Sequence, residues 1–201
     1  MSTMEYTRID ASHAAAARTT ITRAFAADPL LEWLFPAEQW EASERLDAIA
    51  TFYWPSVESY AARSAGHVAV DEGAVVGVAV WRIPDKGSPG LTLPSASGIA
   101  RLLLGDKLRA LAEGMREARG DSALPSGPYL HDLAVTADRR GEGIGTALIE
   151  AGLREFGAEG AWLETTNPNN HGLYERAGFE EVHAGAVGDS GVTMTRMAVN
   201  H

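Results

Sequence analysis

Residues 139–146 read Arg-Arg-Gly-Glu-Gly-Ile-Gly-Thr, and this stretch is the strongest indication of the fold. Three glycines alternate along it, and an apolar helical stripe begins at Ile144. Glycine tolerates positive φ and lets another group approach the backbone closely. The N-terminus of a helix adds free amides and a partial positive charge. With its two arginines, the segment therefore predicts a loop that binds a pyrophosphate at the start of a helix.

Three other interpretations of this loop compete with that one. A P-loop needs a Lys after its last glycine, but Gly145 is followed by Thr-Ala, so this interpretation is rejected. A Rossmann site needs the pattern G-x-G-x-x-G directly after a strand, whereas here the pattern is G-x-G-x-G and five residues separate Val135 from Gly141. Only Glu164 favours the Rossmann interpretation, because it is placed where an acidic residue that binds the ribose would stand. The third interpretation is a turn that merely lets a helix pack on a sheet.

Apolar spacing and turn signals divide the chain into alternating strands and helices. Strands are predicted at residues 4–8, 66–71, 74–82, 129–135, 161–165, 179–187 and 192–199. Helices are predicted from a cap at Asp10 or Ser12 to about residue 26, after Asp28-Pro29, and at residues 40–62, 99–104, 108–115, 144–154 and 170–177. Pro55 predicts a kink or a break in the third of these helices. The alternation indicates an α/β (α+β) fold with a mixed sheet.

Composition narrows the function. The 201 residues fit one domain, with 45% apolar and 22% charged side chains. A formal net charge of −10 disfavours nucleic acid and favours small cations as guests. The absence of cysteine excludes disulfides, thiolate metal sites and a catalytic Cys, and no metal site is predicted. Neither a transmembrane segment nor a signal peptide is recognised, so a cytoplasmic location is expected.

The stretch 129–151 resembles the acetyl-CoA-binding motif of the GNAT superfamily of N-acyltransferases. That motif, Arg/Gln-x-x-Gly-x-Gly/Ala, matches residues 140–145, and the strand Leu-His-Asp-Leu-Ala-Val precedes it at 130–135. A second family motif resembles Asn-Pro-Asn-Asn-His-Gly-Leu-Tyr at 167–174, followed by Gly178-Phe179. The resemblance implies one domain over residues 1–201, with a variable substrate side at 1–65 and a core at 66–199. It also implies a mostly antiparallel twisted sheet that is split at the cofactor site and flanked by helices.

The resemblance assigns the cofactor-binding residues. The backbone at Leu133 and Val135 would pair with the pantetheine arm, as an added strand does, and Asn167 would hydrogen-bond to it. The backbone amides of the glycine loop would hold the pyrophosphate, with Arg140 nearby. The full predicted set for acetyl-CoA is Leu133, Ala134, Val135, Arg140, Gly141, Glu142, Gly143, Ile144, Gly145, Thr146, Asn167 and Tyr174.

The resemblance also makes Tyr174 the acid that protonates the leaving thiolate. A phenol with a pKa of about 10 can give its proton to a thiolate whose conjugate thiol has a pKa of about 8.5 as the C–S bond breaks. The base is open. Strand alternation places His131 and Asp132 on opposite faces, so at least one should line a cleft. His131 has the better intrinsic pKa for a base near neutral pH. Glu164 is a third candidate, and its structural role is the favoured one.

Two functions from different classes follow. The first is acetyl transfer from acetyl-CoA to a primary amine of a small molecule or peptide, by direct attack in a ternary complex. The second is an acyl-CoA sensor without turnover. The predicted partners are acetyl-CoA and an amine, with no nucleic acid and no membrane, and a homodimer stays open. The aromatic residues of the N-terminal helices either pack in the core or line the acceptor pocket. In the second case, Glu32 or Glu58 would bind a cation of the acceptor. Residues 84–98 are predicted to form a loop that faces the substrate. The aromatic residues are Trp33, Phe35, Trp40, Tyr53 and Trp54.

Overall fold

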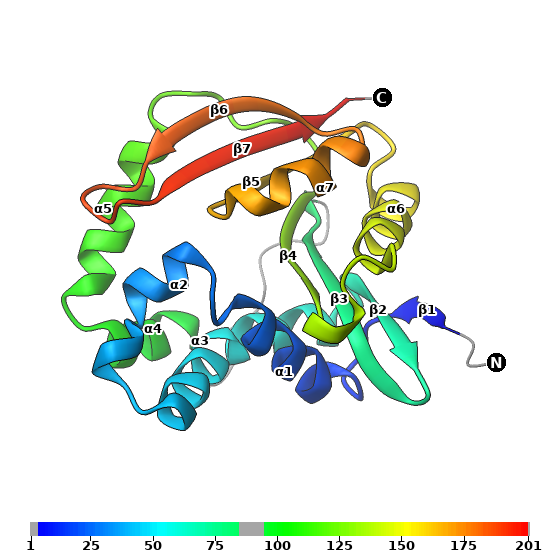
Figure 1. The fold of residues 1–201 in the computed structure, drawn as a ribbon. Coiled ribbons are helices and arrows are strands. Elements are labelled where there is room, and N and C mark those ends of the chain that lie inside the picture. Colours follow the sequence, from blue (N-terminus) through cyan, green and yellow to red (C-terminus); the bar gives the residue numbers. More distant parts are fainter. Residues whose placement is uncertain (1–3, 85–94, 201) are drawn as a thin grey trace.

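A computed structural model describes residues 4–84 and 95–200 of the chain. The described strands form one sheet of seven strands in the order β1-β2-β3-β4-β5-β7-β6 (Figure 1). Neighbouring strands are antiparallel except β4 and β5, which are parallel. The strands are β1 (Glu5–Arg8), β2 (Gly66–Asp71), β3 (Ala74–Arg82), β4 (Tyr129–Val135), β5 (Ala161–Thr165), β6 (Glu180–Ala186) and β7 (Thr193–Val199). All seven predicted strands are confirmed to within one residue at each end.

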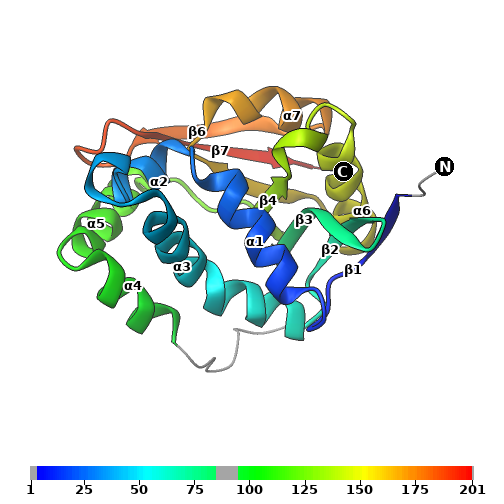
Figure 2. The same ribbon diagram turned by 60° about the horizontal axis from the view of Figure 1, so that its bottom comes forward.

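The helices are distributed over both faces of the sheet. Figures 1 and 2 show the N-terminal helices gathered on one side of the β2–β4 region, with α6 on the other. The helices are α1 (Ala14–Phe25), α2 (Pro29–Leu34), α3 (Ala42–Ala62), α4 (Ala96–Leu104), α5 (Lys107–Arg119), α6 (Ile144–Phe156) and α7 (His171–Arg176). This mixed, mostly antiparallel sheet with flanking helices confirms the predicted fold class.

Strand β3 separates two cores, because its nearly continuous apolar run is covered on both faces. Val78 and Val80 are buried in the cluster made with α1 and α3. Ala79 and Trp81 are buried in the cluster made with α6. Helix α6 approaches this second face closely at Gly152, where an added Cβ would stand 2.3 Å from the Trp81 ring. The alternation of β3 side chains thus fixes the N-terminal helices and α6 on opposite faces.

The sheet opens between β4 and β5, at the only parallel pair among the described strands. The two strands are in register at Tyr129 with Trp162 and at Leu130 with Leu163, and no further pairs follow. From residue 131 to residue 135, the edge of β4 that faces β5 is therefore not paired with it. The split that the family resemblance implies is present, and it lies directly before the glycine loop.

Three local predictions need correction. Helix α1 begins at Ala14 after an uncapped His13, because the Asp10 carboxylate accepts from the Ser12 backbone in the preceding turn. Helix α3 continues past Pro55, so of the kink or break predicted there, the break does not occur. Helix α4 begins at Ala96, three residues early, because the Ser95 hydroxyl accepts from Gly98 and caps it.

Two expectations from the sequence can be compared only with the residues that the structure describes. Most of the predicted substrate-facing loop at 84–98 lies at residues 85–94, outside the described residues. In the ranges that the structure does describe, no helix has both the length and the apolar character needed to span a bilayer.

Candidate active site

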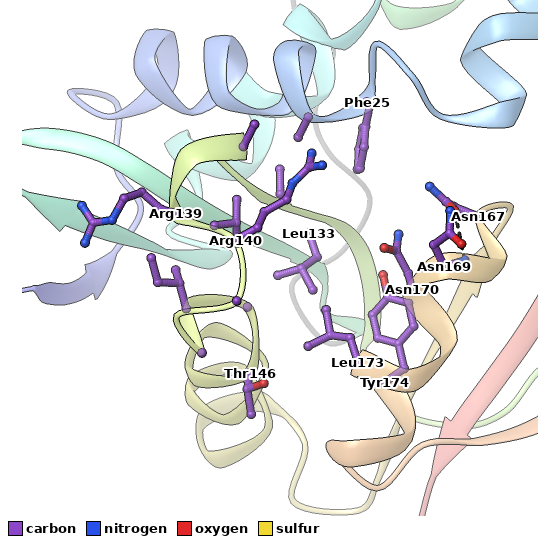
Figure 3. Close-up of a pocket in the computed structure, with 18 of the residues that line it drawn as sticks. Phe25, Leu133, Arg139, Arg140, Thr146, Asn167, Asn169, Asn170, Leu173 and Tyr174 are labelled. Atoms are coloured by element: carbon purple, nitrogen blue, oxygen red, sulfur yellow. Dashed lines mark hydrogen bonds between the residues drawn. The ribbon is translucent and has the colours of Figure 1, made fainter.

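A cleft of about 760 Å³ opens where β4 and β5 part. Its walls come from the end of α1, the last residues of β4, the glycine loop and α7 (Figure 3). Eleven of the twelve predicted cofactor residues line it: Leu133, Ala134, Val135, Arg140, Gly141, Gly143, Ile144, Gly145, Thr146, Asn167 and Tyr174. Glu142 is not among the lining residues, and its side chain instead pairs with Arg139 at 2.9 Å. The prediction that Glu142 contacts acetyl-CoA therefore concerns its backbone amide, and it stays a prediction.

The glycine loop turns by using conformations that favour glycine. Gly141 and Gly143 have φ values of +84° and +81°. A Cβ added at either position would meet nothing within 4 Å, so these glycines border open space. Gly143 is also the residue directly before α6, whose first backbone amides have no partner within the helix. The loop therefore leaves its backbone open to an anion, as a pyrophosphate would require.

Cations surround this cleft. Arg23, Arg139, Arg140 and Arg176 line it, while none of its described lining residues is acidic. Arg139 is held in place by hydrogen bonds to Asp71 and Glu142, which raise the pKa of its guanidinium. In Figure 3, Arg140 extends toward the helix that ends near Phe25. The sequence motifs did not predict Arg23, which comes from α1, or Arg176, which lies on α7 two residues beyond Tyr174.

A second, smaller cavity of about 120 Å³ adjoins the cleft. The two share four lining residues, namely Phe25, Leu133, Asn170 and Tyr174. Tyr174 thus stands at the junction, with only 7% of its surface exposed. Burial, together with the negative charges of Asp132 and Asp28, raises the pKa of its hydroxyl. Tyr174 therefore keeps its proton at neutral pH, as a proton donor must, although its hydroxyl is a weaker acid than a free phenol.

His131 and Asp132 both line the smaller cavity and contact each other. Nδ1 of His131 lies 2.9 Å from Oδ2 of Asp132. The prediction that they occupy opposite faces is wrong, because the β3–β4 register shifts here: Leu130 pairs with Trp81 and Asp132 with Val80, leaving His131 as a bulge. Side chains on either side of a bulge no longer alternate.

The electrostatics of this pair suit a base. Asp132 is 6% exposed, whereas the His131 side chain is 37% exposed. Burial alone would lower the pKa of His131, but the charge of Asp132 and its hydrogen bond outweigh this effect and raise that pKa. With Nδ1–H donating to Asp132, the lone pair of the neutral ring lies on Nε2.

Comparison with known proteins agrees with this geometry. Residues 27–179 match the Acetyltransferase (GNAT) family. The chain belongs to this family. A solved structure named histone acetyltransferase HPA2 and related acetyltransferase, from Corynebacterium glutamicum, is 22% identical over 100% of this chain and 98% of that one, with a TM-score of 0.68.

Other GNAT structures show the same fold at lower identity. The polyamine N-acetyltransferase of Drosophila melanogaster is 18% identical over 99% of this chain and 100% of its own, with a TM-score of 0.62. The PaiA N-acetyltransferase of Thermoplasma acidophilum, solved with coenzyme A, is 10% identical over 99% of each chain, with a TM-score of 0.57. At these identities the likeness establishes the fold.

In this GNAT chain the other acidic candidates have structural partners. Glu164 lines the smaller cavity, but Arg119 and Arg196 contact its carboxylate at 2.6 Å and 2.8 Å. Burial alone would raise the pKa of Glu164, and the hydrogen bonds of the two arginines outweigh it and lower that pKa. Glu164 is therefore a poor proton acceptor, which agrees with the favoured structural interpretation.

The alternative in which Glu32 or Glu58 holds a cation in the acceptor pocket is not supported by the structure. Glu32 pairs with Arg45 at 2.9 Å and Glu58 with Arg18 at 3.5 Å, and neither lines the cleft or the cavity. Of the N-terminal aromatic residues named above, only Tyr53 lines the cavity. Sequence reasoning missed Asp28 and Phe25, which also line it. The sequence around Asp28 indicates only a helix cap, and nothing local to it signals a site.

Proposed function

We propose that this GNAT protein transfers an acetyl group from acetyl-CoA to a primary amine of a small molecule or peptide, by direct attack in a ternary complex. The position of Tyr174 carries the proposal, since it stands between a cleft lined by arginines and a cavity lined by carboxylates. A polyanionic donor suits the first and a cationic acceptor suits the second. Both substrates would then meet at one protonated phenol.

The larger cleft would hold the donor. The β4 edge beyond Leu130 is not paired with β5, so the backbone at Leu133 and Val135 can pair with the pantetheine arm. Asn167 borders the same cleft, and its side-chain oxygen is fixed by the Asn169 N–H at 3.1 Å. The loop at 141–146 would receive the pyrophosphate. When bound, acetyl-CoA supplies the activated thioester.

The smaller cavity would prepare the acceptor. An alkylammonium with a pKa of about 10.4 must lose a proton before it can attack, at a cost of about 4.6 kcal/mol at pH 7. Nε2 of His131 would accept that proton directly or through one water, and Asp132 would stabilise the imidazolium that forms. Asp132 would also keep the ring in the tautomer whose lone pair is on Nε2.

Tyr174 would complete the transfer. As the amine nitrogen bonds to the carbonyl carbon and the C–S bond breaks, the Tyr174 hydroxyl gives its proton to the departing sulfur. The products are an amide and coenzyme A, with the proton of the amine on His131. The bonded nitrogen gives its second proton to the Tyr174 phenolate, and His131 releases the ammonium proton to solvent, so the protein is unchanged and one proton is released per turnover.

Relatives of the same fold support amines as acceptors. The polyamine N-acetyltransferase of Drosophila melanogaster catalyses the formation of N-acetylagmatine. A second solved structure is an agmatine N-acetyltransferase, with 16% identity and a TM-score of 0.60. The acceptors of both enzymes agree with a cavity that carries carboxylates.

Release of free thiol from acetyl-CoA across a panel of amines tests the proposal. The chain has no cysteine, so every thiol detected comes from coenzyme A. We expect amine-dependent release and the corresponding acetylated product by mass spectrometry. Binding of acetyl-CoA without release with any amine would instead favour the sensor function.

Thermal unfolding with nucleotides tests the donor separately. Coenzyme A should stabilise the fold by about 2.7 kcal/mol at a hundredfold excess over Kd, and NAD should not. Stabilisation by NAD alone would restore the Rossmann-type interpretation of the glycine loop.

A further inference from the structure

The smaller cavity holds three carboxylates, and their partners differ. Glu164 is neutralised by Arg119 and Arg196. Asp132 contacts His131. Asp28 has no cationic partner anywhere in residues 4–84 and 95–200, and none of the cavity's described lining residues is Lys or Arg. Among the described residues, the buried carboxylate of Asp28 is thus left without a cationic counterion.

The hydrogen bonds of Asp28 do not replace a counterion. Asp28 precedes α2 and accepts the Leu30 N–H at 3.0 Å and the Thr166 hydroxyl at 3.2 Å, both on Oδ1. Both donors are neutral, and a carboxylate has about four lone-pair sites, so acceptor capacity remains. The residue is only 9% exposed, and burial raises its pKa despite these bonds. A cation would find here a desolvated carboxylate held rigidly by two elements.

Tyr53 gives a second, independent observation. It lines the same cavity, is 8% exposed, and its ring is packed between Phe25 and Phe52 at 5.6 Å and 5.5 Å. Within the described part of the chain, no group hydrogen-bonds to its hydroxyl. The hydroxyl oxygen is not one of the fully buried polar atoms that lack a partner among the described residues, so it borders the open space of the cavity, where a ligand atom can hydrogen-bond to it.

We propose that Asp28 and Tyr53 bind a second, non-reacting cationic group of the acceptor, so that the acceptor is a compact diamine. This inference rests on the proposed function, because the other amino group would face His131 and Asp132. A monoamine would supply one cation to a cavity with two carboxylates that no Lys or Arg of residues 4–84 and 95–200 neutralises. The volume of about 120 Å³ corresponds to roughly four waters, enough for a short aliphatic chain.

The test compares diaminobutane with butylamine, which have the same carbon chain and differ by one amino group. Wild-type protein should favour diaminobutane in kcat/KM by about 10- to 100-fold, the usual worth of one hydrogen-bonded charge. Asp28→Asn should reduce that ratio to near unity, mainly by raising KM for diaminobutane. Asn caps helices as well as Asp does, so the amide can still accept the Leu30 N–H.

Glu32→Gln is the matched control. It also removes one negative charge from α2, but at a residue that pairs with Arg45 outside the cavity, so the ratio should not change. No preference for the diamine in wild type would overturn the inference, as would a preference that survives Asp28→Asn. If Asp28→Asn does not fold, Tyr53→Phe decides: a fall of about fivefold in the ratio supports the subsite, and an unchanged ratio overturns it.

Calorimetric binding of diaminobutane separates this inference from the proposed function. The measurement needs no turnover. If no amine is acetylated but diaminobutane binds and Asp28→Asn weakens that binding about tenfold or more, the catalytic proposal fails and the diamine subsite stands. If amines are acetylated but diaminobutane binds no better than butylamine, the subsite fails and the catalytic proposal stands.

Discussion

The cleft and the adjoining cavity have opposite electrostatic character although they share a wall. The cleft is bordered by four arginines and no described carboxylate, and the cavity by three carboxylates and no described Lys or Arg. Although the net charge of the chain is −10, arginine side chains line the cleft, while none of the described residues that line the cavity is Lys or Arg. The contrast separates an anionic donor from a cationic acceptor before any chemistry takes place.

The two regions also differ in how they are built. The cleft depends on backbone: positive φ at Gly141 and Gly143, free amides at the start of α6, and an unpaired strand edge. The cavity depends on side chains brought from α2, α3, β4 and β5. A site built from backbone requires glycines at fixed spacing, while a cavity of side chains can be altered one residue at a time. The cleft should therefore fix the donor, and the cavity should select the acceptor.

Tyr174→Phe should have the largest effect, because Tyr174 belongs to both regions. The change keeps the ring and its contact with Phe179 at 6.3 Å, but removes the proton donor. Turnover should fall by about 10²–10⁴, the usual contribution of a positioned acid. Coenzyme A affinity should change by about 1 kcal/mol at most, the worth of one hydrogen bond. Normal turnover with a true acceptor would mean that Tyr174 only packs the junction.

Gly143→Val should disable the cleft alone. Val strongly disfavours a φ of +81°, and its side chain would project into the open space of the cleft. Affinity for coenzyme A should fall at least about 100-fold, as measured by calorimetry. Gly73→Val is a matched control, since Gly73 also has a φ of +81° with nothing near an added Cβ, yet lies in the β2–β3 turn. Equal loss of affinity in both variants would implicate general destabilisation.

This contrast also explains which parts could be predicted from sequence. The glycine loop and the Asn167–Tyr174 segment are local, so their spacing alone indicates a loop, a helix and the residues that line the cleft. The strands were predictable for the same reason, since alternation and turn residues act over a few positions. Eleven lining residues of the cleft follow from two short motifs.

The cavity could not be predicted in this way. Asp28 meets Thr166 across 138 positions of sequence, and no local pattern encodes that contact. The bulge at His131 depends on the register with β3, so strand alternation predicts the wrong faces for His131 and Asp132. Glu32 and Glu58 have the right charge, but partners on α3 and α1 hold them at the surface.

Asp132→Asn should sharpen the assignment of the base within the cavity. The raised pKa of His131 means that this ring is protonated, and inactive as a base, until the pH passes a value above its usual 6.5. The acid limb of kcat/KM should therefore lie above pH 6.5 in wild type. Asp132→Asn removes the charge that raises this pKa, so the limb should move to lower pH and activity should fall by about 10- to 100-fold. An unmoved limb would assign it to another group.

Arg23→Gln should have the smallest effect and tests the cationic side of the contrast. Arg23 lies at the end of α1, borders the cleft and has no ion pair within the described ranges. An exposed arginine that contacts a phosphate through partly screened charge is worth about 1 kcal/mol, so the Kd for coenzyme A should rise about fivefold at low salt. The difference should shrink at high ionic strength, since the Debye length falls to about 3 Å at 1 M. Arg18→Gln is the control on the same helix, because Arg18 pairs with Glu58 and does not line the cleft. A loss of affinity that is equal in the two variants and independent of salt would mean that α1 acts through packing, and that the arginines of the cleft do not select the donor.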